Sequence, residues 1–329
     1  MNERSNEPAI SIVTACYNSL GFIDRLYDSL RRQTYRNFEW ICVDDCSSDE
    51  TVEHLRKLES PGDLGMRLFR LPQNSGASMA IVLGVLKARG QAIIIMDHDD
   101  EFMPHGLAAV RDSWPAVEND TELCGLAFQA AHPTGELIGR LIPIGTRFTH
   151  SWMMNIHPDA HDATFALKAE DAKAAHDPRR LEGVCTWGVV MNDLTARKRF
   201  VAGSGSPIRY YHRDNPNSQM NAWKLSRKWV FSYARYLDQA DIYYLRRPLK
   251  WIRHTIALAR YSRIVHGSYL HSLRDIQRFS MKMALVASVL PAALLDLLRP
   301  KEAIVIDAPP FPIGTLAGLE DLRASAPPA

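Results

Sequence analysis

The stretch AIIIMDHDDE, residues 92–101, decides the fold of this chain. Its first half is an apolar run of the length expected for a buried strand, and its second half delivers Asp97, Asp99 and Asp100 within four residues. Carboxylates this close together must be solvated, hydrogen-bonded or bound to a hard divalent cation. Taken alone, the stretch fits two readings: a metal and phosphate site, or an acidic loop in which Asp99 or Asp100 caps the next helix.

Outward from this stretch, short runs rich in β-forming residues alternate with helical patterns. The expected strands are residues 10–14, 39–43, 66–71, 92–96 and 123–129. The apolar positions that recur at helical spacing between them are expected in the core: Ile23, Leu26, Tyr27, Leu30, Val52, Leu55, Leu58, Met79, Val82, Leu83 and Leu86. The alternation predicts an α/β fold with a Rossmann-like, mostly parallel central sheet flanked by helices.

The composition of the 329 residues is that of a globular protein, with 46% hydrophobic and 23% charged residues. The five cysteines form no CxxC pair, which argues against a disulfide framework or a zinc cluster and favours a reducing, cytoplasmic setting. The first residues lack the apolar core of a secretory signal. The nearest approach to a membrane span, residues 283–298, is interrupted by Pro291 and Asp296, so no ordinary span is expected.

The net charge of +2 conceals a strong asymmetry. Residues 1–222 hold 23 Lys or Arg against 29 Asp or Glu, whereas residues 223–282 hold 13 against 3. We therefore expect a catalytic domain at 1–222, a basic, aromatic-rich helical extension at 223–300 and a loosely packed Ala/Pro-rich tail at 301–329. The extension suits peripheral contact with an anionic membrane surface or a packing role in a homo-oligomer. Nucleic acid is disfavoured, because the acidic first part would repel phosphate backbones.

Polar residues follow each of the first four strands. In an open α/β sheet, ligands bind beyond the carboxyl ends of the strands. These ends carry residues 14–18, 44–49, 74–76 and 97–101. Asp44 and Asp49 also have structural readings, as a turn acid and as a helix N-cap. The convergence predicts a nucleotide site at one edge of the sheet.

The four strand ends, read in order as VTACYN, VDDCSSDET, PQNSGAS and MDHDDEFMP, resemble the family 2 glycosyltransferases, which have the GT-A fold. The resemblance covers residues 9–218. It implies a hexosyltransferase-type enzyme that moves a sugar from a nucleotide-sugar, a UDP-sugar above all, to an acceptor hydroxyl. It also implies an inverting reaction, dependence on Mn²⁺ or Mg²⁺, and a saccharide or lipid-linked acceptor in surface polysaccharide or glycolipid synthesis.

The resemblance also implies roles for single residues. Tyr17 matches the aromatic near the nucleotide base, and Asp45 matches the acid that hydrogen-bonds the base. Asp97 and Asp99 match the DXD-like element, with Asp99 as the metal ligand and Asp97 nearer the ribose or also on the metal. The other residues assigned to the nucleotide are Ala15, Asn74, His98 and Arg213. Asp100 is left with two readings, as a cap for a helix at 104–110 or as a contact to the donor sugar.

An inverting transferase needs a base that takes the proton of the acceptor hydroxyl. The segment RLEG, residues 180–183, is the best match to the family's Glu-Asp pair and makes Glu182 the first choice. Gly183 replaces the expected second acid, and a salt bridge to a neighbouring arginine is an equal reading of Glu182. The competitors are Asp162, Glu170 and Asp171.

The later segment RYYHRDNPNS, residues 209–218, resembles the family's basic loop over the diphosphate. It makes His212 a candidate third metal ligand, although an isolated histidine is more often structural, and it places Arg213 to pair with phosphate oxygens.

Two rival functions remain. One is a catalytically silent nucleotide-sugar-binding protein, given Gly183. The other is a nucleotidyltransferase, whose Gly-rich, Arg-containing loop after the first strand is absent here.

Overall fold

The computed structural model describes residues 7–60, 62–139, 142–156, 163–178, 187–196, 198–203, 205–215, 226–239 and 248–298. Its main feature is an eight-stranded sheet with the order β3-β2-β1-β4-β9-β6-β10-β8. The strands are β1 (Ile10–Cys16), β2 (Phe38–Asp44), β3 (Met66–Arg70), β4 (Ala92–Ile95), β6 (Leu123–Phe128), β8 (Arg147–Phe148), β9 (Thr164–Lys168) and β10 (Arg199–Ala202). The predicted α/β fold with a mostly parallel sheet is confirmed.

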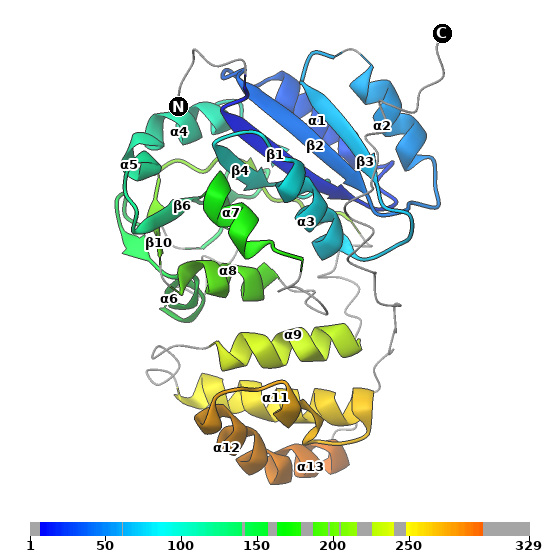
Figure 1. Cartoon of the computed structure of the whole chain (residues 1–329), viewed down its shortest axis with the longest axis vertical. Helices are drawn as coiled ribbons and strands as arrows, with labels where there is room; N and C mark the ends of the chain where they lie inside the picture. Colours follow the sequence, from blue (N-terminus) through cyan, green and yellow to red (C-terminus); the bar gives the residue numbers. More distant parts are fainter. Residues whose placement is uncertain are drawn as a thin grey trace.

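Helices cover both faces of this sheet, because its central strands are apolar on both sides. One face carries α1 (Ile23–Arg31), α2 (Thr51–Glu59), α4 (Gly106–Ser113) and α5 (Pro115–Glu118). The other carries α3 (Ala77–Lys87), α7 (Ala169–Ala175) and α8 (Trp187–Thr195), with α6 (His150–Ile156) beside α8. Figure 1 shows α3, α7 and α8 together in front of the sheet.

Most of the predicted core positions are buried as expected. Leu58 and Met79 are only partly buried, and Leu86 is 38% exposed, so it lies on the outer side of α3. The predicted strands agree with the observed ones to within two residues at each end. Strands β8, β9 and β10 were not predicted, because the pattern of residues 140–218 is weak.

Strand β9 runs antiparallel to both of its neighbours, β4 and β6. Lys168, at its carboxyl end, therefore pairs with Ala92 at the amino end of β4. The next residue, Ala169, begins α7 and donates its N–H to the carbonyl of Gln91 over 2.9 Å. Helix α7 thus starts at the edge of the sheet opposite to the acidic stretch.

A small second sheet stands beside the acidic stretch. Its strands are β5 (Glu101–Phe102), β7 (Ala130–Ala131) and β11 (Arg209–Tyr210), in the order β5-β11-β7. Strand β11 pairs antiparallel with β5, with Arg209 opposite Phe102 and Tyr210 opposite Glu101. This pairing brings the segment that follows residue 209 next to the turn at 97–101.

Helices follow the sheet region in the chain, as the sequence predicted for the extension. They are α9 (Arg227–Asp238), α11 (Pro248–His266), the short 3-10 helix η2 (His271–Arg274), α12 (Phe279–Ala287) and α13 (Val289–Leu298). They share a core of their own that includes Val230, Leu258 and Leu285. Helix α9 lies between α8 and α11, and α12 and α13 lie on the far side of α11 (Figure 1).

The sequence predicted no ordinary membrane span, because Pro291 and Asp296 interrupt residues 283–298. Within the described residues, Phe279–Leu298 is one helical segment whose length and composition would allow it to cross a membrane. Two features distinguish it from a simple span. A turn at Ser288 divides it into α12 and α13, and Pro291 lies in the first turn of α13, where its missing N–H is tolerated.

Candidate active site

The carboxyl ends of β2, β1 and β4 lie side by side, because these three strands are parallel neighbours. Asp44 pairs with Cys16 across β2 and β1, and Met96 donates its N–H to the carbonyl of Val13 over 3.0 Å. The turns that begin at Tyr17 and Asp45, together with the acidic stretch, therefore meet at one edge, as the sequence predicted.

Within the acidic stretch, the four side chains have very different surroundings. The side chain of Asp97 is 63% exposed, whereas Asp100 is fully buried. His98 and Asp99 are half-buried, and His98 Nδ1 lies 3.3 Å from the carbonyl oxygen of Ala15. Asp97 and Asp99 are therefore the aspartates of this turn that solvent can reach.

Asp100 has a structural role that neither prediction for it anticipated. Its Oδ2 accepts a hydrogen bond from Arg209 Nη1 at 3.0 Å, and its Oδ1 accepts one from the N–H of His212 at 2.9 Å. Burial raises the pKa of Asp100 to about 7, although the positive charge of Arg209 acts in the opposite direction. The N-cap residue of α4 is His105, so Asp100 does not cap that helix.

Asp99 is held in place from two sides. Its Oδ2 accepts a hydrogen bond from Asn215 Nδ2 at 2.8 Å, and its backbone carbonyl accepts one from Arg25 Nη1 at 2.8 Å. Arg25 also pairs with Asp214, with Nη2 2.6 Å from Oδ2, and this hydrogen bond holds the pKa of Asp214 below its usual value. The side chains of α1 and of the segment after β11 thus fix the orientation of Asp99.

Sequence reasoning missed Arg209, Asn215 and Arg25 as parts of this site. The first two lie in the segment RYYHRDNPNS, so the resemblance located the right loop but not the residues that make contact. No motif in the sequence points to Arg25. Its position on α1 is that of an ordinary solvent-facing arginine until the fold brings Asp99 to it.

His212 and Arg213 lie beside the acidic stretch. His212 Nε2 is 3.2 Å from Glu101 Oε1, and the guanidinium of Arg213 lies over the ring of Tyr211 at 5.6 Å from its centroid. Arg213 is exposed, so its donors can reach a bound anion. The roles of His212 on a metal and of Arg213 on phosphate remain predictions.

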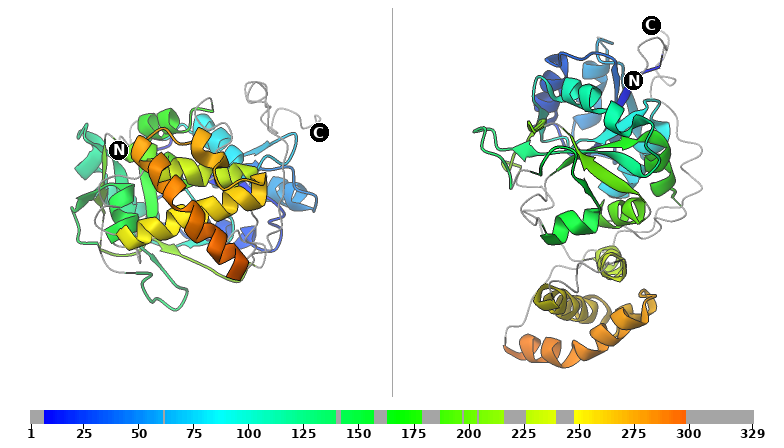
Figure 2. Two further views of the ribbon diagram at one scale, coloured as in Figure 1. Left: turned by 90° about the horizontal axis from the view of Figure 1, so that it is seen from below. Right: turned by 90° about the vertical axis from the view of Figure 1, so that its left-hand side faces the viewer.

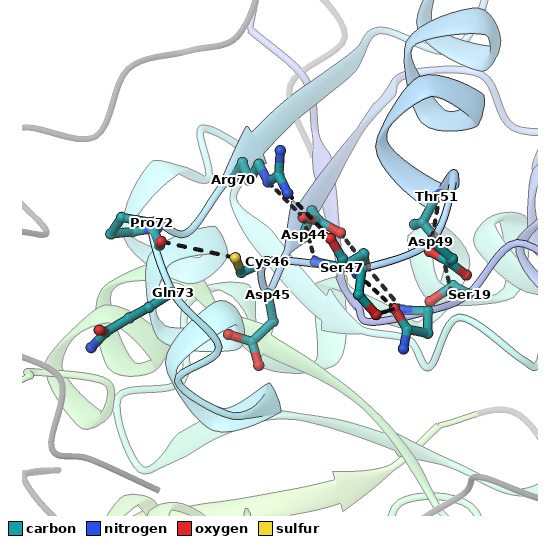
Figure 3. Close-up of polar contacts among 12 residues, drawn as sticks. Ser19, Asp44, Asp45, Cys46, Ser47, Asp49, Thr51, Arg70, Pro72 and Gln73 are labelled. Atoms are coloured by element: carbon teal, nitrogen blue, oxygen red, sulfur yellow. Dashed lines mark hydrogen bonds and ion pairs between the residues drawn. The ribbon is translucent and has the colours of Figure 1, made fainter.

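Asp45 follows β2 and lies beside the start of α3. Figure 3 shows its carboxylate pointing away from Asp44 and Ser47. The carboxylate accepts hydrogen bonds from the N–H groups of Ser75 at 2.7 Å and Gly76 at 2.8 Å. Gly76 has φ +91°, a conformation that favours glycine, and it is the N-cap residue of α3. Both Asp45 oxygens therefore accept backbone N–H groups at the start of α3.

The charge of Asp45 is sensitive to its surroundings. Burial raises the pKa of its carboxyl to about 6, although the two backbone N–H groups act in the opposite direction. The positive charge of Lys228 also lowers this pKa. Because Lys228 is the second residue of α9, the extension contributes a cation to the surroundings of the sheet edge.

The loops after β1 and β2 are tied together by polar contacts (Figure 3). The Asp44 carboxylate accepts from the N–H of Ser47 at 3.0 Å and pairs with Arg70 at 3.2 Å, which agrees with its reading as a turn acid. Asp49 Oδ1 accepts from the N–H of Thr51 at 3.1 Å, although the N-cap position of α2 is Glu50.

Tyr17 stands on the fixed loop that follows β1. Tyr17 is 45% exposed, and its N–H donates to the hydroxyl of Ser19 at 3.0 Å. The next residue, Asn18, donates its N–H to Ser47 Oγ, also over 3.0 Å. The backbone here is held on both sides, so the exposed ring is presented to solvent from a rigid base. Asn74, on the loop before α3, is also exposed.

The candidate bases divide into two groups. Glu182 and Asp162 lie outside the described residues. Glu170 and Asp171 lie in the first turn of α7, at the opposite edge of the sheet from the acidic stretch. Asp171 also pairs with Lys198, whose Nζ is 2.6 Å from Oδ1.

Among the described residues, no group of three or more His, Cys, Asp or Glu side chains is arranged to hold a metal ion. This agrees with the way proteins usually bind Mg²⁺. One or two carboxylates hold the ion, while waters and substrate phosphates complete its octahedron. Asp97 and Asp99 offer hard oxygen ligands of this kind, so the residues present fit a cation that arrives with a phosphorylated substrate.

The site and the fold define a glycosyltransferase with a GT-A fold, and comparison with known proteins bears this out. The family model described as Glycosyl transferase family 2 matches residues 11–127. TuaG of Bacillus subtilis, a glycosyltransferase assigned to teichuronic acid biosynthesis, is 32% identical over 236 residues, which cover 69% of this chain and 88% of TuaG. The chain belongs to the family 2 glycosyltransferases.

Other relatives match over shorter lengths. An uncharacterized glycosyltransferase of Haemophilus influenzae is 35% identical over 29% of this chain and 38% of its own length. The succinoglycan biosynthesis protein ExoO of Rhizobium meliloti is 35% identical over 30% of this chain and 28% of its own length. The chain therefore matches well under half the length of each of these two proteins.

Among solved structures, S. aureus TarS in complex with UDP-GlcNAc superimposes with a TM-score of 0.55. The match covers 85% of this chain and 79% of that chain, at 15% sequence identity. At this identity the likeness establishes the GT-A fold.

Proposed function

We propose that this chain transfers a sugar from a UDP-sugar to an acceptor hydroxyl, with a divalent cation and with inversion at the anomeric carbon. The observation that carries the proposal is the meeting of Asp45, Asp97 and Asp99 at one edge of three adjacent strands. Ligands of open α/β sheets bind at such an edge. The setting that we propose is the assembly of a surface polysaccharide or glycolipid.

Asp99, and with it Asp97, would hold Mn²⁺ or Mg²⁺. When bound, the cation neutralises the negative charge that develops on the departing nucleotide diphosphate. The protein's own contribution is the orientation of Asp99, which Asn215 and Arg25 hold through the contacts described above. The exposed Arg213 is placed to donate to a phosphate oxygen beside it.

The nucleoside would lie between Tyr17 and Asp45. The exposed Tyr17 ring offers a flat surface for a base, and Asp45 offers carboxylate oxygens. Both Asp45 oxygens already accept N–H groups, but each oxygen has a second lone pair for a base N–H. That S. aureus TarS binds UDP-GlcNAc supports uracil as the base.

A carboxylate must take the acceptor proton, and we propose Glu182 for this role. The position of α7 argues against Glu170 and Asp171. Asp97 lies six residues after Gln91, which contacts the start of α7, and six steps of extended chain span about 20 Å. A group at that distance cannot form the hydrogen bond that proton transfer requires.

The acceptor is proposed to be a saccharide or a lipid-linked saccharide. The support is that two relatives are named for polysaccharide biosynthesis, TuaG for teichuronic acid and ExoO for succinoglycan. A catalytically silent nucleotide-sugar-binding protein is the rival that Gly183 favours, because it replaces the second acid of the family's pair. The experiment must therefore separate donor binding from turnover.

Titration calorimetry with UDP, in Mn²⁺ and again in excess chelator, tests donor binding, and hydrolysis of UDP-sugars tests turnover. We expect metal-dependent binding and hydrolysis in the native chain, and loss of both in Asp99→Ala. The matched control is Asp112→Ala, which removes an exposed carboxylate on α4 and should change neither. Binding without hydrolysis of any UDP-sugar would favour the silent protein. Metal-independent binding that Asp99→Ala leaves intact would overturn the metal assignment.

A further inference from the structure

One side of α12 and α13 is an exposed apolar surface, which we call the outer face. Its members are Phe279, Met283, Val286, Leu290, Leu294 and Leu297, which are between 44% and 81% exposed. They follow one another at intervals of three or four residues, so they lie along one side of the helical path. Soluble proteins rarely leave so large a contiguous apolar surface in water.

The opposite side of the same two helices is packed into the protein. Met281, Leu285, Ala292 and Asp296 are buried, at positions offset by two residues from members of the outer face. Two residues correspond to a rotation of about 200° on a helix. Ser288, at the turn between the helices, donates its hydroxyl to Thr255 Oγ1 of α11 over 2.8 Å. The pair is therefore amphipathic, with its inner side fixed to α11.

The one acid of α12 and α13 is neutralised on that inner side. Burial alone would raise the pKa of Asp296, but hydrogen bonds from Arg260, Arg263 and Tyr269 hold it below its usual value. Arg260 Nε lies 2.5 Å from Oδ1 and Arg263 Nε lies 2.9 Å from Oδ2. A helix that crossed a bilayer would have to break these contacts and take an unpaired carboxylate into hydrocarbon, which is costly.

Positive charge accompanies the outer face. Residues 248–298 contain seven Lys or Arg against two Asp or Glu, a net charge of +5. Arg274 and Arg278 are exposed, and Lys282 of α12 is partly exposed. The second acid, Asp275, is partly buried beside Arg274. A surface of apolar side chains and cations is complementary to anionic lipid headgroups above acyl chains.

The position of the outer face leaves it accessible to a large flat partner. Helices α12 and α13 lie at the end of the molecule farthest from the sheet in the upright view of Figure 1. The right-hand view of Figure 2 shows the same two helices at that end, below α11. A planar surface can therefore approach them without meeting the sheet region.

We propose that the outer face docks onto the surface of an anionic lipid bilayer, with α12 and α13 lying in the plane of the interface. The apolar side chains of the outer face enter the boundary between headgroups and acyl chains, while the inner side stays on α11. This proposal does not depend on the sugar donor or on Glu182. A second copy of the chain is the other occupant that the face would fit, and the test separates the two.

The experiment is flotation of the full chain with vesicles of phosphatidylcholine, with and without phosphatidylglycerol. We expect binding to the anionic vesicles and weaker binding to the neutral ones. The triple variant Leu290→Ser, Leu294→Ser and Leu297→Ser should lower the partition coefficient at least about tenfold, because each leucine contributes apolar area to insertion. The double variant Arg278→Ser and Lys282→Ser should remove the preference for anionic vesicles.

The matched control is Ile144→Ser, which removes an apolar side chain that is 69% exposed in the sheet region. It should leave vesicle binding unchanged, and thermal unfolding should show that all variants are folded. Sedimentation velocity measures whether a second copy of the chain occupies the outer face instead. A native dimer that the triple variant converts to a monomer, with no vesicle binding, would overturn the proposal. Vesicle binding that resists alkaline carbonate extraction would overturn the in-plane placement in favour of a crossing.

Discussion

Arg209 and Asp100 form a buried ion pair, with Arg209 Nη1 3.0 Å from Asp100 Oδ2. Arg209 is 7% exposed and Asp100 is fully buried. The pair joins β11, from the small sheet, to the acidic stretch that follows β4. One of the three aspartates of that stretch is therefore structural, and it fixes the turn that carries Asp97 and Asp99.

Replacing Arg209 with methionine should destabilise the protein. The change leaves the Asp100 carboxylate buried without its cation, and breaking a buried pair in this way costs about 3 to 5 kcal/mol. The loss should be smaller at about pH 5 than at about pH 8, because a protonated Asp100 needs no counter-charge. Urea denaturation at both pH values measures it.

The control for this change is Arg147→Met. Arg147 pairs with Asp120 at 2.7 Å on the surface, where its side chain is 50% exposed. Its loss should cost less than about 1 kcal/mol. Equal effects of the two variants would show that the Arg209 pair contributes no more than a surface pair.

Asn215→Ala should weaken the binding of the divalent cation without unfolding the protein. Asn215 donates to Asp99 Oδ2 and so orients the proposed ligand. Loss of such a supporting contact typically lowers metal affinity about 10- to 100-fold. Titration of Mn²⁺ in the presence of UDP measures the change, and Asn119→Ala on the exposed end of α5 serves as control. An unchanged Mn²⁺ affinity would argue that Asp99 is not the ligand.

Asp45→Asn should change the dependence of stability on pH. The pKa of Asp45 is raised from 3.8 to about 6 in the folded protein, so the folded state keeps its proton where the unfolded chain has lost it. The resulting stabilisation is present below about pH 4 and is lost as the pH rises through about 6. The free energy of unfolding of the native chain minus that of the variant should fall across this window.

The size of this fall is on the order of 3 kcal/mol, since the shift is about two pKa units and one unit corresponds to about 1.4 kcal/mol. Parallel urea titrations of both proteins between about pH 4 and pH 7 provide the measurement. Asparagine keeps the shape but not the proton equilibrium, so effects that do not depend on pH cancel in the slope. A difference that stays flat, or that grows with pH, would contradict the raised pKa.

Glu182→Gln should leave UDP binding intact and slow sugar transfer by about 10²- to 10⁴-fold, because it removes the proposed base and nothing from the donor site. Glu170→Gln is the matched control, since Glu170 is exposed at the opposite edge of the sheet. It should retain full activity. If the Glu170 variant loses transfer and the Glu182 variant does not, the assignment of the base is wrong.

The sequence was sufficient to predict five of the eight strands of the sheet and the edge where the candidate site lies. Apolar strands and amphipathic helices alternate along residues 10–129, and in a parallel sheet this pattern alone determines which turns meet. Asp45, Asp97 and Asp99 could therefore be grouped without coordinates. Strand β9 escaped prediction because its five residues follow a weakly patterned region, and a short buried strand has no periodicity of its own.

The partners of the acidic stretch could not be predicted, for a different reason. Arg25 lies 74 residues from Asp99 in the chain, and Arg209 lies 109 residues from Asp100. Such contacts depend on the packing of α1 and on the pairing of β11 with β5, neither of which leaves a local signal. The exposed leucines of α12 and α13 were likewise hidden in the sequence, because Pro291 and Asp296 interrupt the apolar run that contains them.

The stacking of α9, α11 and α13 sets a minimum distance between the outer face and the sheet region. Packed helices lie about 8 to 10 Å apart, so two such steps place the start of α9, with Lys228, about 20 Å from the helices that carry the outer face. With the outer face on a bilayer, an acceptor attached to that bilayer would have to reach outward by at least this length to meet the donor. If the docking and sugar-transfer proposals both hold, a short glycolipid would not reach the site, and an already extended lipid-linked saccharide would.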